Sequence, residues 1–137
     1  MNLKACSLGA IFAVAVAAPA LAHHSFAMFD ANKIVTAKGT VKEFEWVNPH
    51  SWIRVMIVDQ ATGRQLQWAF EMSSPATMTR LGMTPDTVKV GDTVTVTYHP
   101  LKDGSRGGQF MQALLPNGAL AVRREGGPDL RTEGYKE

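Results

Sequence analysis

The sequence predicts a mostly β domain with one short helix, and three observations lead to this fold class. Five segments are rich in β-branched and aromatic residues, and three of them alternate apolar with polar residues. Pro- and Gly-containing breaks separate most of these segments. One segment, after the third strand, instead has the start and stop signals of a helix. The expected order is therefore three strands, a helix and two strands.

The first three expected strands form the beginning of the domain. Gly39 interrupts the first strand, which indicates a bulge or a sharp bend, and Asn48-Pro49 ends it. Gly63 marks a hairpin turn between the second strand and the third. In both of these strands every other residue is apolar, so one face of each is expected to enter the core. We expect the three strands at Lys33 to Trp46, Ser51 to Val58 and Gln65 to Met72.

The helix is expected directly after the third strand. A serine can cap it, Pro75 suits its first turn and Gly82 can end it. Met78 and Leu81 are three residues apart and are expected to face the core. The remaining strands are expected at Asp92 to His99 and Gln109 to Leu115, with a short closing strand over Ala119 to Val122. This order is that of the oligonucleotide/oligosaccharide-binding (OB) fold, a small five-stranded barrel.

The first 22 residues have the three parts of a secretory signal peptide. Lys4 supplies the positive start, an apolar run follows, and Ala20-Leu21-Ala22 is a small-residue cleavage site. The run is too short for a membrane span, so no stable membrane insertion is expected after cleavage. We expect a periplasmic protein whose mature chain begins at His23. An OB-like domain then covers residues 23–122, and a disordered polar tail covers 123–137.

Composition excludes several classes of function. The only cysteine, Cys6, lies in the leader, so the mature chain forms no disulfide. The net charge of +2 gives no basic surplus of the kind that marks a nucleic-acid binder. The sequence has no His-Glu-x-x-His motif, phosphate-binding glycine loop or Gly-x-Ser-x-Gly elbow. These features favour a non-enzymatic role and leave the question of an enzyme open.

The histidines are the candidate metal ligands. Cleavage before His23 would give one residue two ligand nitrogens, the ring nitrogen and an α-amine whose pKa of about 8 lets copper displace its proton. His24 offers an alternative mode through its ring, the amine and the intervening amide. His50, after the Asn-Pro corner, is the expected third ligand, and His99 at a strand end is a further candidate. Copper(II) prefers such nitrogen ligands in a plane. Each histidine also fits an ordinary surface or turn-capping position.

A second hypothesis concerns the face of the second and third strands, the usual ligand platform of this fold. Trp52 and Arg54 lie off the aliphatic face of the second strand and could contact a glycan, a peptide or a protein partner in the periplasm. Alternatively, Trp52 covers a second small core, as large aromatic residues often do. The methionines are expected to fill the core. The two hypotheses are therefore copper sequestration or delivery and non-enzymatic partner binding.

Four segments carry a resemblance that extends over His23 to Leu120. They read HHSFAMFD, GTVKEFEWVNPHSWI, WAFEMSSP and VKVGDTVTVTYHPLKDGSRGG. The chain resembles a family of small exported bacterial proteins of unknown function, and the His-His-Ser-Phe opening and the Asn-Pro-His corner are the most specific parts. The resemblance implies export and a small barrel-like domain. It implies no catalytic residue, and it matches His23, His24 and His50 to motif positions.

Overall fold

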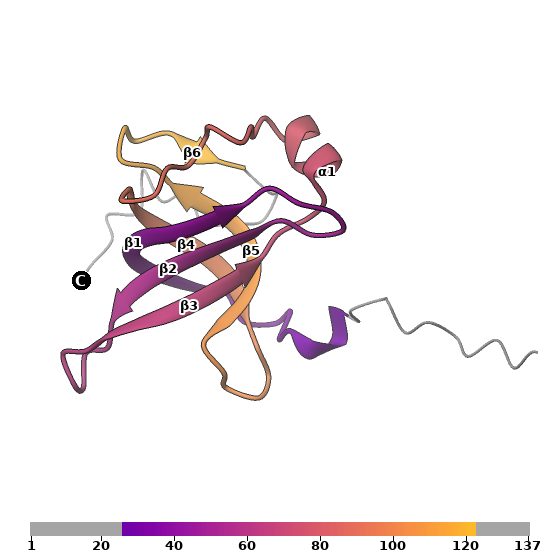
Figure 1. Cartoon of the computed structure of the whole chain (residues 1–137). Coiled ribbons are helices and arrows are strands. Elements are labelled where there is room, and N and C mark those ends of the chain that lie inside the picture. Colours follow the sequence, from indigo (N-terminus) through magenta and orange to yellow (C-terminus); the bar gives the residue numbers. More distant parts are fainter. Residues whose placement is uncertain (1–25, 123–137) are drawn as a thin grey trace, which may run out of the picture.

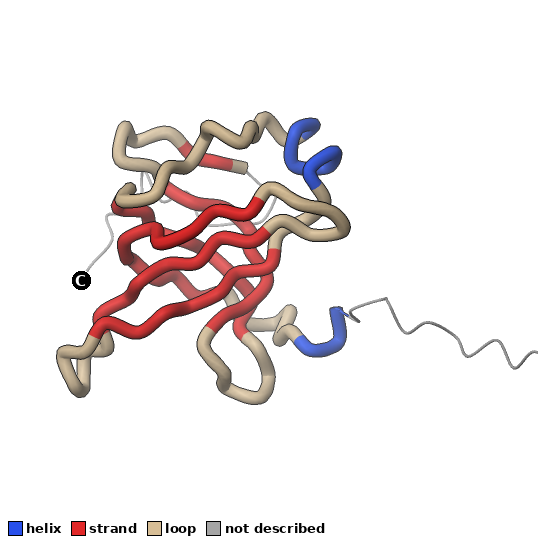
Figure 2. The backbone as a smooth tube through the Cα atoms, viewed as in Figure 1, coloured by secondary structure: helices blue, strands red, loops and turns tan. Residues whose placement is uncertain are grey.

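The computed structural model describes residues 26–122. The expected signal peptide, the expected tail and the candidate ligands His23 and His24 lie outside the described residues. A 3-10 turn, η1, precedes six strands and one helix (Figure 1; Figure 2). These elements are η1 (Phe26–Met28), β1 (Val35–Glu45), β2 (Trp52–Val58), β3 (Gln65–Glu71), α1 (Pro75–Arg80), β4 (Thr93–Pro100), β5 (Gly107–Leu114) and β6 (Leu120–Ala121). Within residues 26–122, no helix is long and apolar enough to cross a membrane.

The strands close into the predicted five-stranded barrel. The sheet order is β3-β2-β1-β4-β5-β6, and a further parallel pairing of β3 with β5 joins the two sides. All other pairs are antiparallel. The OB-like fold class and its strand-strand-strand-helix-strand-strand order are therefore confirmed, with β6 as the short additional strand.

The first strand bends from one side of the barrel to the other. It pairs with β4 over Val35 to Thr40 and with β2 from Thr40 onward. The bulge lies between Val41 and Glu43, two residues beyond the expected position at Gly39. A side chain at Gly39 would collide with the carbonyl oxygen of Met56. The glycine therefore permits a close approach of two backbones, and the bulge beside it turns the strand.

The barrel closes through two glycines that the sequence pattern assigned to a loop. Gly107 pairs with Ala69 and Gly108 with Phe70 in the parallel β3–β5 ladder. A Cβ atom at Gly107 would collide with the carbonyl oxygen of Ala69, and Gly107 has a φ of +153°. Because only glycine tolerates this approach, β5 begins two residues earlier than the expected Gln109.

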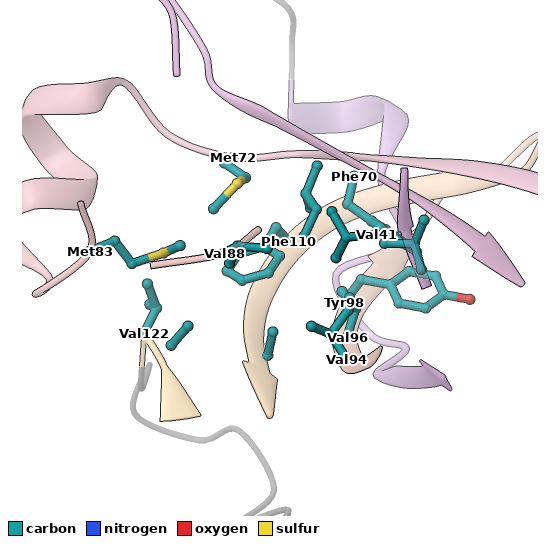
Figure 3. Packing of buried hydrophobic residues seen from close by; sticks show 14 of the residues in the cluster. Val41, Phe70, Met72, Met83, Val88, Val94, Val96, Tyr98, Phe110 and Val122 are labelled. Carbon is teal, nitrogen blue, oxygen red and sulfur yellow. The ribbon is translucent and has the colours of Figure 1, made fainter. Parts of the chain in front are cut away.

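The predicted inward faces form the core. Apolar residues that alternate along β2, β3 and β4 meet inside the barrel together with methionines from the segments around α1 (Figure 3). The buried cluster comprises Val41, Ile53, Val55, Phe70, Met72, Met78, Met83, Val88, Val94, Val96, Tyr98, Phe110, Ala113, Ala121 and Val122. Thr97 and Gln112, on the opposite face of β4 and β5, are nevertheless fully buried. The outward side of this strand pair is therefore not a solvated face.

The helix is shorter than expected. The side chain of Ser74 caps it by accepting from the Thr77 amide, and Met78 enters the core as predicted. The expectation for Leu81 was wrong, because its side chain is 41% exposed. The helix ends at Arg80, so Leu81 is the C-cap and no longer follows the helical face. Met83, whose amide donates to the Met78 carbonyl, is buried there instead.

Candidate functional site

His50 and Glu71 form an acid–base pair at the end of the barrel. His50 follows the cis Asn48-Pro49 bond and precedes β2, while Glu71 is the last residue of β3. The ring Nδ1 of His50 contacts Glu71 Oε1. The Glu71 side chain is only 7% exposed, and that of His50 is 29% exposed. His50 is one of the residues predicted from the sequence, whereas Glu71 is not.

The register of the β2–β3 hairpin brings these two residues together. Val58 pairs with Gln65 beside the turn, and the ladder runs without a shift to Trp52 opposite Glu71. One step further, the Ser51 amide donates to the Ser73 carbonyl at 3.1 Å. His50 therefore leaves the sheet beside Glu71. Counting back from the predicted turn places Glu71 opposite Trp52 and diagonal to His50.

The contact between Glu71 and the His50 ring determines which ring nitrogen carries the proton when the histidine is neutral. A buried carboxylate is costly unless a partner compensates its charge, and His50 provides a donor. When Nδ1 donates to the carboxylate, the lone pair of the neutral ring resides on Nε2. A carboxylate that orients a histidine in this way is a common outer partner of metal-binding histidines. In that tautomer, Nε2 carries the lone pair with which a neutral histidine coordinates a metal ion.

The N-terminal segment docks beside this pair. Phe29 forms an isolated bridge with Leu101, and its side chain is 5% exposed. The Asp30 amide donates to the Pro100 carbonyl at 2.8 Å, and the Lys102 amide donates to the Met28 carbonyl at 3.0 Å. This segment therefore packs on the barrel, and Phe29 anchors it.

A pocket of about 230 Å³ lies between the segment, the His50 corner and the start of α1. In Figure 1, η1 and α1 lie on the same side of the barrel. The described lining residues are Phe26, Phe29, Pro49, His50, Glu71, Met72, Ser73, Ser74, Thr77, Gln109 and Phe110. The first described residue of the chain thus shares a pocket with His50.

His99 has a different position. Its Nδ1 lies 2.7 Å from the Lys33 carbonyl oxygen, and it is not among the described residues that line the pocket. His99 pairs with Gln109, which in turn pairs with Glu71. Two strand spacings place the His99 and Glu71 backbones roughly 10 Å apart. Within residues 26–122, no three His, Cys, Asp or Glu side chains converge as a metal site.

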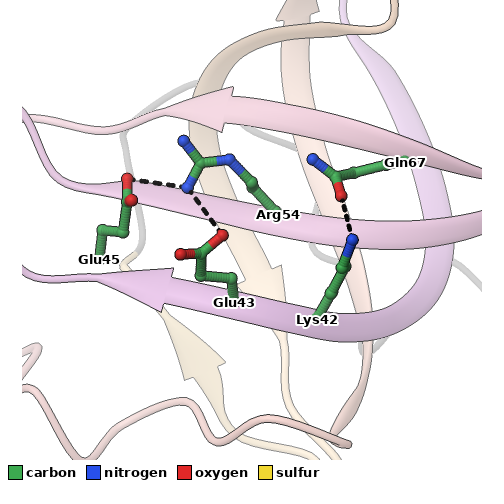
Figure 4. A network of polar contacts seen from close by, with 5 residues as sticks. All are labelled: Lys42, Glu43, Glu45, Arg54 and Gln67. Carbon is green, nitrogen blue, oxygen red and sulfur yellow. Dashed lines mark hydrogen bonds and ion pairs between the residues drawn. The ribbon is translucent and has the colours of Figure 1, made fainter.

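Trp52 and Arg54 lie on the outer face of β2, as expected. Arg54 Nη1 lies 2.8 Å from Glu45 Oε2 and 3.2 Å from Glu43 Oε2 (Figure 4). The hydrogen bond to Glu45 raises the pKa of Arg54 above its usual value. Trp52 is half-buried. The guanidinium is therefore already held by two carboxylates, and a partner at this face stays a prediction.

Comparisons with known proteins identify a family. No curated protein matches the chain. A family model described as a family of unknown function, DUF6152, matches residues 11–111, which is most of the chain. The chain therefore belongs to this family of unknown function, DUF6152.

Proposed function

We propose that the protein is an exported copper-binding module that sequesters or delivers the ion in the periplasm. His23 or His24 at the mature N-terminus would anchor the copper, and His50 would be the third ligand. One observation carries the proposal: Phe26, close after these histidines in the chain, lines the same pocket as the oriented His50–Glu71 pair.

The length of chain between Phe26 and the expected N-terminus suits a shared site. His24 precedes Phe26 by two residues and His23 by three. Each residue of extended chain spans at most about 3.6 Å, so the His23 backbone can lie anywhere within about 11 Å of Phe26. Since Phe29 anchors the segment, this reach is measured from a fixed point beside His50.

The ligand set matches the preference of copper. The N-terminal amine, the ring of the same residue and the ring of His50 would supply three nitrogens, which copper(II) accepts in a planar arrangement. Glu71 is not needed as a ligand, because its contact with Nδ1 orients the His50 ring. His99 bonds to the Lys33 carbonyl and is the weaker candidate for a fourth ligand.

A copper(II) titration of the mature chain tests the proposal. We expect tight one-to-one binding by a protein with a verified His23 N-terminus. Acetylating the α-amine of His23 should remove most of the affinity, because both the His23 mode and the His24 mode need a free amine. His50→Ala should weaken binding by at least about 10- to 100-fold, because the loss of an outer partner of a metal-bound histidine already costs that much. His99→Ala tests the candidate fourth ligand and should change little, because the His99 ring bonds to the Lys33 carbonyl.

Other outcomes would contradict the proposal. Equal, weak binding by the mature and N-terminally acetylated proteins would exclude the N-terminal site. Full affinity in His50→Ala would leave an N-terminal site that does not involve the pocket. In the first case Trp52→Ala becomes the informative variant, because the partner-binding hypothesis depends on that face of β2.

A further inference from the structure

The pocket beside His50 has the size of a one-ring ligand. Its volume is about 230 Å³. An apolar cavity of about 150 Å³ is large enough to bind benzene, whereas sites for drug-sized molecules occupy about 300–1,000 Å³. The space therefore fits one aromatic ring with one or two substituents.

One side of the pocket is apolar and largely rigid. Phe29 and Phe110 are 5% and 3% exposed, so the barrel holds them in place. Pro49 belongs to the corner before β2, and its ring adds a further apolar surface. Phe26, at 68% exposure, forms the outer part of this wall. Aromatic side chains pack well against another aromatic ring in edge-on or offset geometry.

The other side of the pocket is polar. His50, Glu71 and Gln109 line it together with the hydroxyl-bearing residues at the start of α1. Ser74 and Thr77 contact each other at 3.2 Å, which fixes both side chains as part of the helix cap. An apolar pocket with a few converging polar groups is the usual form of a small-molecule site.

The charged side chains among the described lining residues disfavour the binding of an anionic ligand. Among the described lining residues, none is a lysine or an arginine. Among these same described residues, Glu71 carries the only carboxylate, and it contacts the His50 ring. An anionic ligand would therefore meet a carboxylate and no permanent cation, whereas a neutral hydroxyl can both donate and accept here.

We propose that this pocket binds a small neutral aromatic alcohol, with the ring against Phe29 and Phe110 and the hydroxyl toward Glu71 and Gln109. Phenol represents the class, because its hydroxyl, with a pKa of about 10, is neutral at pH 7. Phenol binding needs no metal ion, but it shares the pocket and His50 with the proposed copper site, so it is tested with a chelator that keeps copper out.

The experiment compares three probes by backbone amide NMR of the mature protein in EDTA. Phenol should shift the amides of residues 73, 74, 76, 77 and 109 in a saturable way, with a Kd of about 1 mM, as expected for seven heavy atoms. Toluene lacks the hydroxyl and benzoate carries a charge, so each should bind at least about tenfold more weakly. The amides of the 59–64 turn serve as an internal control.

Two variants of α1 locate the site. Thr77→Trp should fill the pocket and abolish the phenol shifts. Thr79→Trp, on the exposed side of the same helix, should retain them. Equal binding of benzoate, or no saturable shift with phenol, would overturn the proposal. If Thr77→Trp does not fold, the wild-type shift map decides, because shifts confined to other residues would also overturn it.

Discussion

Two acid–base contacts begin only four residues apart, at His50 and Arg54, and their surroundings differ. Arg54 lies on the outer face of β2 between Glu43 and Glu45, whose side chains are 49% and 34% exposed. His50 lies at the end of the barrel against Glu71, which is 7% exposed. The arginine has two partners that water also solvates. Glu71 has little access to water and faces the His50 ring.

This difference decides which contact matters for stability. An exposed ion pair contributes about 0.2–1 kcal/mol, because solvent and salt screen it and two long side chains lose entropy. A buried carboxylate instead depends on the group that compensates its charge, so the loss of that group is costly. A pairing of a basic with an acidic side chain is therefore expected to stabilise the protein little at Arg54, on the sheet surface. It is expected to stabilise it much more at His50 and Glu71, at the barrel end.

The largest expected effect separates the two contacts directly. His50→Leu should lower the free energy of unfolding by about 3 kcal/mol, because it leaves Glu71 without this partner. Arg54→Leu should lower it by less than about 1 kcal/mol. Urea unfolding in EDTA measures both. The double variant His50→Leu/Glu71→Leu should recover part of the loss, since it also removes the buried charge. A cost for His50→Leu no greater than that for Arg54→Leu would contradict this view.

Salt should sharpen the same comparison with a smaller effect. A double-mutant cycle on Arg54 and Glu45 should give a coupling of about 0.5 kcal/mol at low salt. At 1 M NaCl the Debye length is about 3 Å, so this coupling should fall toward zero. The His50–Glu71 coupling should persist, because buried pairs are screened much less. Equal salt sensitivity of the two cycles would show that water reaches both contacts alike.

Parts of the fold with one face in the core were predictable from the sequence. Ile53 and Val55 are aliphatic residues two positions apart on β2, and this period places both inside the barrel. Gly107 and Gly108 were not expected in a strand, because glycines usually indicate a loop, yet β5 begins at Gly107. Their role depends on Ala69 and His99, whose backbones they approach closely, and local sequence does not reveal that contact.

In the candidate site, too, one residue was predictable from the sequence and the other was not. The Asn-Pro-His corner singles out His50 by its neighbours in the chain. Glu71 alternates with Gln65 and Gln67, so the pattern indicates a solvated face. It is buried because the His50 corner, β5 and the docked N-terminal segment surround the end of β3. Burial that arises from several distant segments leaves no local periodicity, although the hairpin register places Glu71 diagonal to His50.

A third polar contact, on a fully exposed turn, should show the smallest effect. The Thr62 hydroxyl and amide donate to Asp59 Oδ1 at 2.6 and 2.8 Å, and these bonds lower the pKa of Asp59. The contact therefore favours the folded state above the unfolded pKa of Asp59, and this contribution is lost as the pH falls through the lower folded value. Asp59 and Thr62 both remain in water, so their contact should hardly change the free energy of unfolding.

Titration by carboxyl NMR should register this contact. Thr62→Val removes the hydroxyl donor, so the pKa of Asp59 should rise toward its usual value. The pKa of Asp103, which Ser105 lowers through the same pair of donors in the β4–β5 loop, is the control within the same sample and should not move. An unchanged pKa of Asp59 in this variant would mean that the Thr62 amide alone lowers it. The side-chain hydrogen bond on this exposed turn would then contribute nothing, which is an even larger contrast with the buried His50–Glu71 contact.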